Sequence, residues 1–160
     1  MPAPVIRLAV PSDADPVALM SRTLIEHGLP GWSWHPQRVA RSIGSRNTLV
    51  AIAAGHNTIA GFAIMEFGDS HAHLSLLAVR PSQQRRGIGT RLMSWLEESA
   101  LVAGIALINL ELRESNRAAR DFYAALGFVE SACLPGYYQG RESALRMSRD
   151  IRRRISNRTN

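Results

Sequence analysis

The alternation of apolar and polar positions along the chain predicts several strands. Runs in which apolar residues alternate with others, or follow one another without a break, are typical of half-buried and buried strands. Such runs occupy 5–10, 48–54, 58–67, 71–79 and 107–112. Only short turns separate the three runs between 48 and 79, so we expect these three strands to form an antiparallel meander.

A helical period is present in two later segments. Apolar residues recur every three or four positions over 87–103, and Gly104 is suited to end that helix. A second stripe follows Asn116 or Ser115, either of which has an N-capping side chain, and it closes at Gly127. Two helices are therefore expected in the second half of the chain.

The first half also contains helical signals. Ser12 followed by Asp15 resembles a capping box, which predicts a helix from there to about Gly28. Pro36 suits the first turn of a second, short helix. Both helices precede the meander.

Two final strands, at about 128–133 and 143–151, complete the order βααβββαβαββ. This order predicts an α/β fold with a mixed, mostly antiparallel central sheet and helices on both faces. With 160 residues, 46% of them hydrophobic and 20% charged, the chain fits a single domain over residues 1–151.

The composition also bears on location. No apolar run approaches the roughly 20 residues of a membrane-spanning helix, and the N-terminus does not resemble a signal peptide. We therefore expect a soluble, cytoplasmic protein, either a monomer or a homodimer. The single Cys133 has no partner for a disulfide or a redox pair, and we expect it to be a packing residue.

The formal net charge is +6, and all 19 basic residues are arginines because the sequence contains no lysine. Several of them fall in residues 152–160, which we expect to form a basic, disordered tail. A solvated tail is the simplest interpretation. The alternative hypothesis is attraction to an RNA-rich partner such as a ribosome.

The segment VRPSQQRRGIG, residues 79–89, joins a predicted strand to a predicted helix and has the composition of a phosphate-binding turn. Gly87 and Gly89 lack the Cβ atoms that would block a close approach, so backbone N–H groups at the helix N-terminus can point at an anion. Arg85 and Arg86 add charge-assisted hydrogen bonds. An ordinary strand-to-helix turn with solvated arginines is the alternative.

The turn lacks the GK-[ST] of a P-loop and the third glycine of a dinucleotide fingerprint. It resembles the acetyl-CoA-binding signature of the GNAT superfamily of N-acetyltransferases, through Gln84, Gly87 and Gly89. That resemblance implies a GNAT-type fold and acetyl-CoA as co-substrate, with no metal. The implied cofactor-binding residues are Leu77, Ala78, Val79, Gln84, Arg85, Arg86, Gly87, Ile88, Gly89, Thr90 and Asn116.

Residues 111–128, ELRESNRAARDFYAALGF, resemble the ribosomal-protein-alanine N-acetyltransferase group within that superfamily, which acetylates protein N-termini. The resemblance implies that Glu111 is the proton acceptor and Tyr123 the proton donor. It also implies that Asn116 contacts the arm of the cofactor. The same resemblance makes Tyr137 and Tyr138 candidate contacts for the acceptor.

The spacing of these residues agrees with such a role. Glu111 alternates with the apolar residues of its strand and so points away from their face, near the strand's C-terminal end. Pairing of Glu111 with Arg113 or Arg117 in a solvated corner is the alternative. Tyr123 is otherwise expected to be a half-buried packing residue.

Other polar and aromatic residues are less specific. Trp32 and Trp34 line an acceptor groove in one interpretation and pack in the core or at its rim in the other. His71 and His73 fall on one face of a strand, but two histidines are too few ligands for a metal site.

Together these features predict direct transfer of an acetyl group from acetyl-CoA to a primary amine, most plainly the α-amino group of a protein N-terminus. Acetylation of lysine side chains, polyamines or other small amines is the alternative within enzymes. A non-catalytic acetyl-CoA-binding module is the alternative outside them. A basic RNA-binding module fits less well, because the aromatic and basic interleaving of RNA-binding folds is absent.

Overall fold

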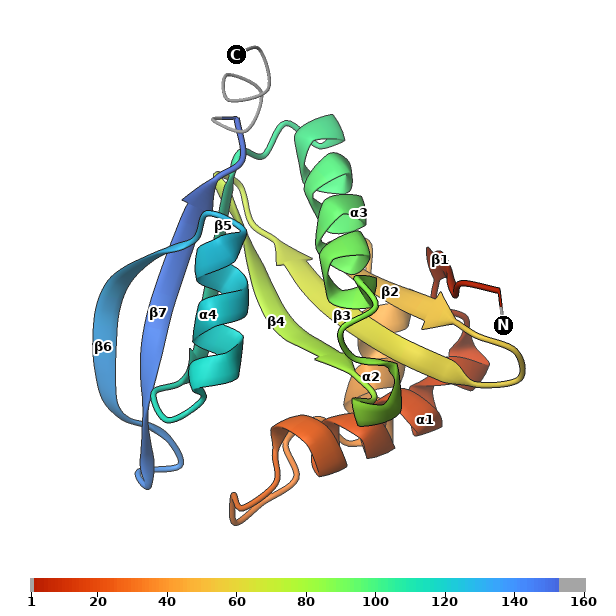
Figure 1. Cartoon of the computed structure of the whole chain (residues 1–160), viewed down its shortest axis with the longest axis horizontal. Helices are drawn as coiled ribbons and strands as arrows, with labels where there is room; N and C mark the ends of the chain where they lie inside the picture. The colour runs from red at the N-terminus through yellow and green to blue at the C-terminus, as the bar shows by residue number, and fades with distance from the viewer. Residues whose placement is uncertain (1, 153–160) are drawn as a thin grey trace.

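The structure, a computed structural model, describes residues 2–152 and contains one seven-stranded sheet in the order β1-β2-β3-β4-β5-β7-β6 (Figure 1). The strands are β1 (Val5–Leu8), β2 (Thr48–Ala54), β3 (Ile59–Phe67), β4 (His71–Val79), β5 (Leu107–Arg113), β6 (Val129–Tyr138) and β7 (Glu142–Asp150). Every neighbouring pair is antiparallel except β4 and β5, which are parallel. The predicted mixed, mostly antiparallel sheet is confirmed.

Helices cover both faces of the sheet, as expected (Figure 1). The helical elements are η1 (Pro11–Asp13), α1 (Ala14–Met20), η2 (Ser21–Ile25), α2 (Pro36–Gly44), η3 (Pro81–Gln83), α3 (Ile88–Val102) and α4 (Arg117–Ala125). Apart from the short η elements, the order of strands and helices is the predicted βααβββαβαββ. Among residues 2–152, no helix is long and apolar enough to cross a membrane.

Two hydrophobic clusters lie on opposite faces of the sheet. The first joins α3 and α4 to side chains such as Leu74, Leu110 and Leu112. The second joins α1 and α2 to side chains such as Leu76 and Ala78. The sheet therefore has an α3/α4 face and an α1/α2 face.

A β-bulge in β4 changes which side chains point to which face. Met65 pairs with Leu74 and Ile64 pairs with Leu76, so Ser75 is an extra residue on β4. Before the bulge, Leu74 faces α3 and α4, whereas after it Leu76 faces α1 and α2. The same shift turns residue 73 toward the α1/α2 face and residue 77 toward the α3/α4 face.

The start of the first helix differs from the prediction. Ser12 is not its cap, because a 3-10 turn over Pro11–Asp13 precedes α1. The Asp13 carboxylate instead accepts hydrogen bonds from the backbone N–H of Val10 at 2.8 Å and from Arg7 at 2.7 and 3.1 Å. The ion pair with β1 determines how the chain enters this helix, and periodicity does not reveal that contact.

The last hairpin is longer than expected. β6 continues to Tyr138, five residues past the predicted end at 133, although its pairing with β7 is irregular between Leu134 and Tyr138. Pro135 and Gly136 fall in this irregular part, which explains why the sequence indicated a loop there. The expected basic tail lies outside the described residues from 153 onward.

Candidate active site

The parallel strands β4 and β5 pair only at their beginnings, from His71 with Leu107 to Leu74 with Leu110. Beyond Leu110, β5 remains paired with β7 while β4 remains paired with β3, so the two strands diverge (Figure 1). We call the stretch in which the backbones of β4 and β5 are no longer paired, at the C-terminal ends of both strands, the opening. Open α/β sheets bind their ligands at such ends.

The backbone of β4 offers hydrogen-bond donors to this opening. The N–H of Arg80 donates to Ala60 O on β3 at 2.8 Å. Because the N–H groups of a strand point alternately to its two neighbours, those of Leu77 and Val79 point the other way, toward the opening. These N–H groups are oriented to pair with an extended chain that carries amide oxygens.

The turn at the end of β4 is built for an anion. Arg85 (φ +63°) and Gly87 (φ +76°) have left-handed backbones, and Gly87 is the N-cap of α3. The bond from Arg91 N to Gly87 O, at 3.0 Å, is the first of the helix, so the N–H groups of residues 88–90 have no acceptor within it. Phosphates are suited to this position, beside the exposed Arg85 and Arg86.

The two glycines of the turn have different roles. Gly87 has open space where a Cβ would lie, so its left-handed backbone is what favours glycine. At Gly89 an added Cβ would lie 3.1 Å from Cζ of Phe122 on α4. The expectation that both glycines clear space for an anion is therefore replaced at Gly89 by close packing between α3 and α4.

Two more of the implied cofactor residues support the local structure. The Gln84 side chain donates to Val79 O at 3.1 Å and so links the turn to the end of β4. The Asn116 side chain accepts from the N–H of Ala119 at 3.1 Å, which makes it the N-cap of α4. Of the two caps considered, Asn116 is the one used.

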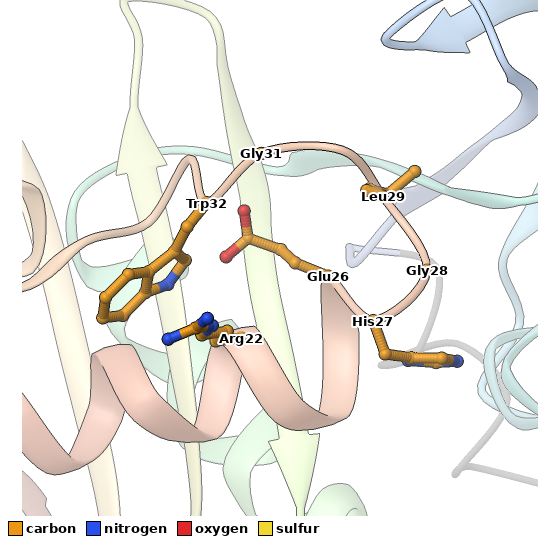
Figure 2. A pocket seen from close by; sticks show the side chains of 7 residues that line it. All are labelled: Arg22, Glu26, His27, Gly28, Leu29, Gly31 and Trp32. Carbon is orange, nitrogen blue, oxygen red and sulfur yellow. The ribbon is translucent and has the colours of Figure 1, made fainter.

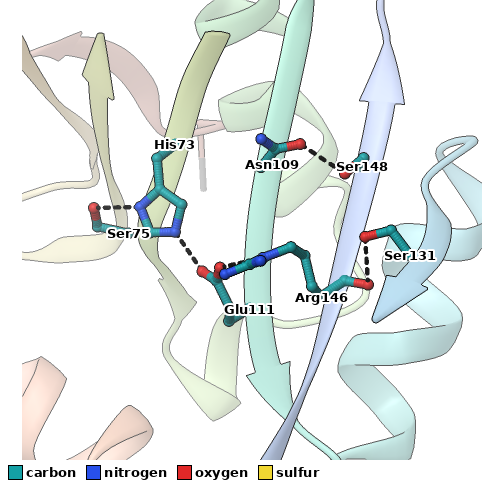
Figure 3. A network of polar contacts seen from close by, with 7 residues as sticks. All are labelled: His73, Ser75, Asn109, Glu111, Ser131, Arg146 and Ser148. Atoms are coloured by element: carbon teal, nitrogen blue, oxygen red, sulfur yellow. Dashed lines mark hydrogen bonds and ion pairs between the residues drawn. The ribbon is translucent and has the colours of Figure 1, made fainter. Parts of the chain in front are cut away.

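Glu111 lies on the α1/α2 face at the centre of a polar network (Figure 3). Only 7% of its side chain is exposed. One carboxylate oxygen accepts from Arg146 Nε at 2.9 Å, and the other is in close contact with His73 Nε2. The strand registers produce this arrangement. Arg146 on β7 is directly opposite Glu111, and His73 on the neighbouring strand β4 pairs with Asn109, two residues before Glu111.

These contacts shift the pKa values of Glu111 and His73. Burial raises the pKa of Glu111, but the hydrogen bonds from His73 and Arg146 outweigh it and hold that pKa below its ordinary value. The hydrogen bond to Glu111 raises the pKa of His73 despite the opposing effect of burial. At neutral pH the carboxylate is therefore ionised.

The alternative pairing of Glu111 with Arg113 or Arg117 is wrong. Arg113 donates to Ile25 O at 2.8 Å and lies 3.5 Å from a carboxylate oxygen of Glu142. The actual partners, His73 and Arg146, were not found from the sequence. Their pairing depends on strand register, for which the hydrophobic pattern alone is not sufficient.

Tyr123 lies on the opposite face of the sheet from Glu111. It is 7% exposed, and its ring packs edge-on against Phe122 and Phe128 with centroids 5.1 and 5.6 Å away. Burial, and secondarily the neighbouring Tyr138, raise the pKa of Tyr123 well above its ordinary value. The phenol therefore keeps its proton across the physiological range.

Tyr137 and Tyr138 are the last two residues of β6, in the β6–β7 hairpin. Their rings are in edge-to-face contact, with centroids 5.0 Å apart. Burial raises the pKa of both phenols, and the charge of Glu111 raises them further, which places the hairpin within electrostatic reach of that carboxylate. Tyr137 is exposed, so its ring is available to a ligand.

Trp32 and Trp34 lie in different environments. Trp34 is buried in the cluster with α1 and α2, and Arg38 stacks 3.7 Å from the centre of its ring, so the packing interpretation applies. Trp32 lines an open pocket of about 280 Å³ in the loop before α2 (Figure 2). The remaining lining residues are Arg22, Glu26, His27, Gly28, Leu29 and Gly31.

This loop lies against the β6–β7 hairpin. An added Cβ at Gly31 would be 3.5 Å from the side chain of Gln139, which follows Tyr138. Arg113 joins Ile25, at the start of the loop region, to Glu142 of β7. Segments far apart in the sequence thus border the α1/α2 side of the opening together.

Cys133 does not match its expectation. It is a free, exposed cysteine on β6, at the edge of the sheet, and not a packing residue. An edge strand with an exposed face leaves alternate side chains in solvent, and Cys133 is one of them.

Comparisons with known proteins identify the family of the chain. Residues 19–128 match the model of the "Acetyltransferase (GNAT) family". The "[Ribosomal protein bS18]-alanine N-acetyltransferase" of Escherichia coli K12 is 33% identical over 130 residues, which cover 79% of this chain and 87% of that protein.

Solved structures give the same result. Ard1 from Thermoplasma volcanium is 25% identical, with a TM-score of 0.80 over 94% of this chain and 99% of that one. A putative streptothricin acetyltransferase from Bacillus anthracis, solved in complex with acetyl coenzyme A, is 27% identical, with a TM-score of 0.63 over 69% of this chain and 66% of that one. The chain therefore belongs to the acetyltransferase (GNAT) family and is an acetyl-CoA-dependent N-acetyltransferase.

Proposed function

We propose that this enzyme acetylates the α-amino group of a protein N-terminus. The observation that carries the proposal is the placement of Glu111, buried between His73 and Arg146 beside the opening between β4 and β5. A carboxylate with a lowered pKa is a weak base. It suits an amine that is already partly neutral.

Reference pKa values separate the candidate acceptors. An α-amino group is roughly a tenth neutral at pH 7, whereas a lysine amine is only a few parts in ten thousand neutral. Making a lysine neutral therefore costs about 3 to 4 kcal/mol more than making an N-terminus neutral. Glu111 and its partners favour the N-terminus on this ground.

Acetyl-CoA supplies an activated acetyl thioester. The residues that would hold it are the N–H groups of Leu77 and Val79 for the pantetheine arm, and the turn from Gln84 to Thr90 for the phosphates, with Asn116 beside them. The same N–H groups of β4 also suit the thioester carbonyl as hydrogen-bond donors.

Glu111 and Tyr123, on the two faces of the sheet, carry out different proton transfers. Glu111 takes a proton from the attacking nitrogen, through a water molecule, as that nitrogen bonds to the carbonyl carbon. Tyr123 gives a proton to the departing sulfur from the other face. The thioester lies in the opening between them, and holding both substrates there supplies much of the rate.

The β6–β7 hairpin and the loop before α2, which contains the pocket, border the α1/α2 side of the opening, where we expect the acceptor to bind. We assign Tyr137, Tyr138 and Trp32 to contacts with the first residues of the acceptor. The name of one relative, the "[Ribosomal protein bS18]-alanine N-acetyltransferase" of E. coli, supports an N-terminal acceptor, because alanine has no amine in its side chain. Trp34 is omitted because it lies in the core.

Other functions make different predictions. Acetylation of lysine or of a polyamine is the enzymatic alternative, and a non-catalytic acetyl-CoA-binding module would bind acetyl-CoA without releasing CoA to any amine. Transfer through an acetylated Cys133 is a further route, because its thiol is exposed. An active Cys133→Ala variant excludes that route.

The test is a panel of acceptors with CoA release as the readout. The panel holds peptides with free N-termini, including ones that begin with Ala, the same peptides blocked at the N-terminus but containing lysine, and polyamines. We expect turnover with the free N-termini only. Turnover confined to the blocked lysine peptides or to polyamines would contradict the proposal.

We also propose that residues 1–151 act as one catalytic domain and that the arginines after Arg152 contribute attraction to RNA. Deleting residues 153–160 should lower RNA association and its salt dependence while leaving turnover of a free peptide intact. Unchanged association would contradict the role of the tail.

A further inference from the structure

The network around Glu111 has two accessible side chains, and because Arg146 is already protonated, the one that can take up a proton is His73. Its side chain is 34% exposed, compared with 7% for Glu111. An ionised carboxylate can only accept hydrogen bonds, so the Nε2–H of His73 donates to Glu111. Neither the proton transfer to Glu111 nor the one from Tyr123 involves this histidine.

The contact with Glu111 also determines which ring nitrogen is free. When hydrogen occupies Nε2, the neutral ring has its lone pair on Nδ1, which lies 3.3 Å from Oγ of Ser75 (Figure 3). The Ser75 hydroxyl can donate to a neutral Nδ1 or accept from a protonated one. The ring nitrogen Nδ1 therefore has a hydrogen-bond partner whether the ring is neutral or protonated. Ser75, which provides this partner, is the extra residue in the bulge of β4.

Charged groups on three strands surround the ring. Glu111 on β5 and Glu66 on β3 stabilise the imidazolium, and Arg146 on β7 opposes it. The net effect is a pKa above the ordinary value for histidine, and the hydrogen bond to Glu111 is the main cause. A general base works best when its pKa is close to that of the group it deprotonates and to the operating pH.

We propose that His73 is the base that takes the first proton from the α-ammonium group of the acceptor, with Glu111 holding the ring so that Nδ1 is free to receive it. This inference rests on the proposed function. An N–H bond of the ammonium breaks, its electron pair stays on nitrogen, and the proton joins Nδ1, directly or through the Ser75 hydroxyl and water. The imidazolium then releases this proton to solvent.

The assignment gives the two bases different tasks. An α-ammonium group must lose one proton before it attacks and a second one as the amide forms. The nitrogen is a much stronger acid once it is bonded to the carbonyl carbon, so the weakly basic Glu111 suffices for the second proton. The sulfur takes one proton from Tyr123, and the balance of the reaction is one proton released to solvent.

The test compares kcat as a function of pH for the wild type, His73→Gln and His71→Gln, with both substrates saturating. His71 lies on the same strand and forms its side-chain contact with Ser70, so it is the matched control. In the wild type we expect kcat to fall on the acid side as His73 becomes protonated. His73→Gln should lower kcat by about 100-fold near pH 7 and move this acid limb to the pKa of the acceptor amine, because only acceptor that is already neutral can then react, while His71→Gln behaves like the wild type.

Two outcomes would overturn the assignment. One is a His73→Gln variant whose kcat stays within about twofold of the wild type. The other is a loss of similar size at every pH with the limb unmoved, because that would show only a structural role. The profile is measured with whichever amine the enzyme acetylates, so a wrong acceptor class contradicts the proposed function without removing this test.

If His73→Gln does not fold, a measurement on the wild-type protein still tests the inference. In ¹⁵N-histidine NMR, we expect neutral His73 to carry its hydrogen on Nε2 and to titrate above the ordinary histidine pKa. A hydrogen on Nδ1, or titration below that value, would overturn the inference.

Discussion

The carboxylate of Glu111 and the ring of Tyr123 lie on opposite faces of the sheet, and Glu111 is placed just past the point where β4 and β5 stop pairing. Glu111 follows the last residue of β5 that pairs with β4, and Tyr123 packs from α4 into the same cluster as the neighbouring Leu110 and Leu112. A thioester between the two side chains would meet a base from one side and an acid from the other.

Replacing Glu111 by Gln should reduce kcat/KM for a free N-terminal peptide by about 100-fold or more, because the amide cannot take the proton of the attacking nitrogen. Binding of acetyl-CoA, measured by calorimetry, should change little. Glu114→Gln is the matched control, since Glu114 is exposed in the turn after β5. Wild-type turnover of Glu111→Gln over pH 6 to 9 would show that another group is the base.

Tyr123→Phe should keep the fold and lose turnover. The ring still packs between Phe122 and Phe128, so the melting temperature should stay within a few degrees of the wild type. Loss of the proton donor should lower kcat by about 100-fold. A folded, cofactor-bound variant with full kcat would contradict the role of the phenol.

Gly89→Ala should weaken acetyl-CoA binding because the new Cβ, 3.1 Å from Phe122, makes the Phe122 ring or the start of α3 shift, next to the turn to which we assign the phosphates. The smaller side chain in Phe122→Leu should restore part of that loss in the double variant. Gly44→Ala is the control, since nothing lies near its Cβ position. Equal losses in the single and double variants would show that packing against Phe122 is not the reason for this glycine.

The His73–Glu111 pair should make stability depend on pH. The raised pKa of His73 contributes stability that is fully present below its unfolded value of about 6.5 and is lost as pH rises through the folded pKa. The lowered pKa of Glu111 contributes stability above about pH 4.3 that is lost as pH falls through the folded pKa.

The difference in free energy of unfolding between the wild type and His73→Gln should therefore be larger at about pH 5.5 than at about pH 9. Urea denaturation at the two pH values measures it. A difference that is the same at both, or larger at the higher pH, would show that the pair does not form as described.

The elements of the fold were largely predictable from the sequence, and the partners of the site residues were not. β2 and β4 begin and end where the apolar runs do, because each run is bounded by turn residues. Glu111 could be placed on the polar face of β5 by alternation. Its contacts with His73 and Arg146 depend on the register of β4, β5 and β7, which side-chain alternation within one strand does not specify.

The β-bulge at Ser75 shows the same limit. A strict alternation over 71–79 predicts that alternate residues share one face, but the extra residue divides β4 between the two faces of the sheet. His73 consequently joins Glu111 on the α1/α2 face, while Leu77 packs on the other. Only the pairing with β3 reveals this.

The most direct test of the account uses one peptide that has both a free N-terminus and an internal lysine, incubated with the enzyme and acetyl-CoA at pH 7. Fragmentation by mass spectrometry then locates the acetyl group. The account predicts acetylation of the α-amino group. An acetyl group on the lysine, with the N-terminus free, would contradict it.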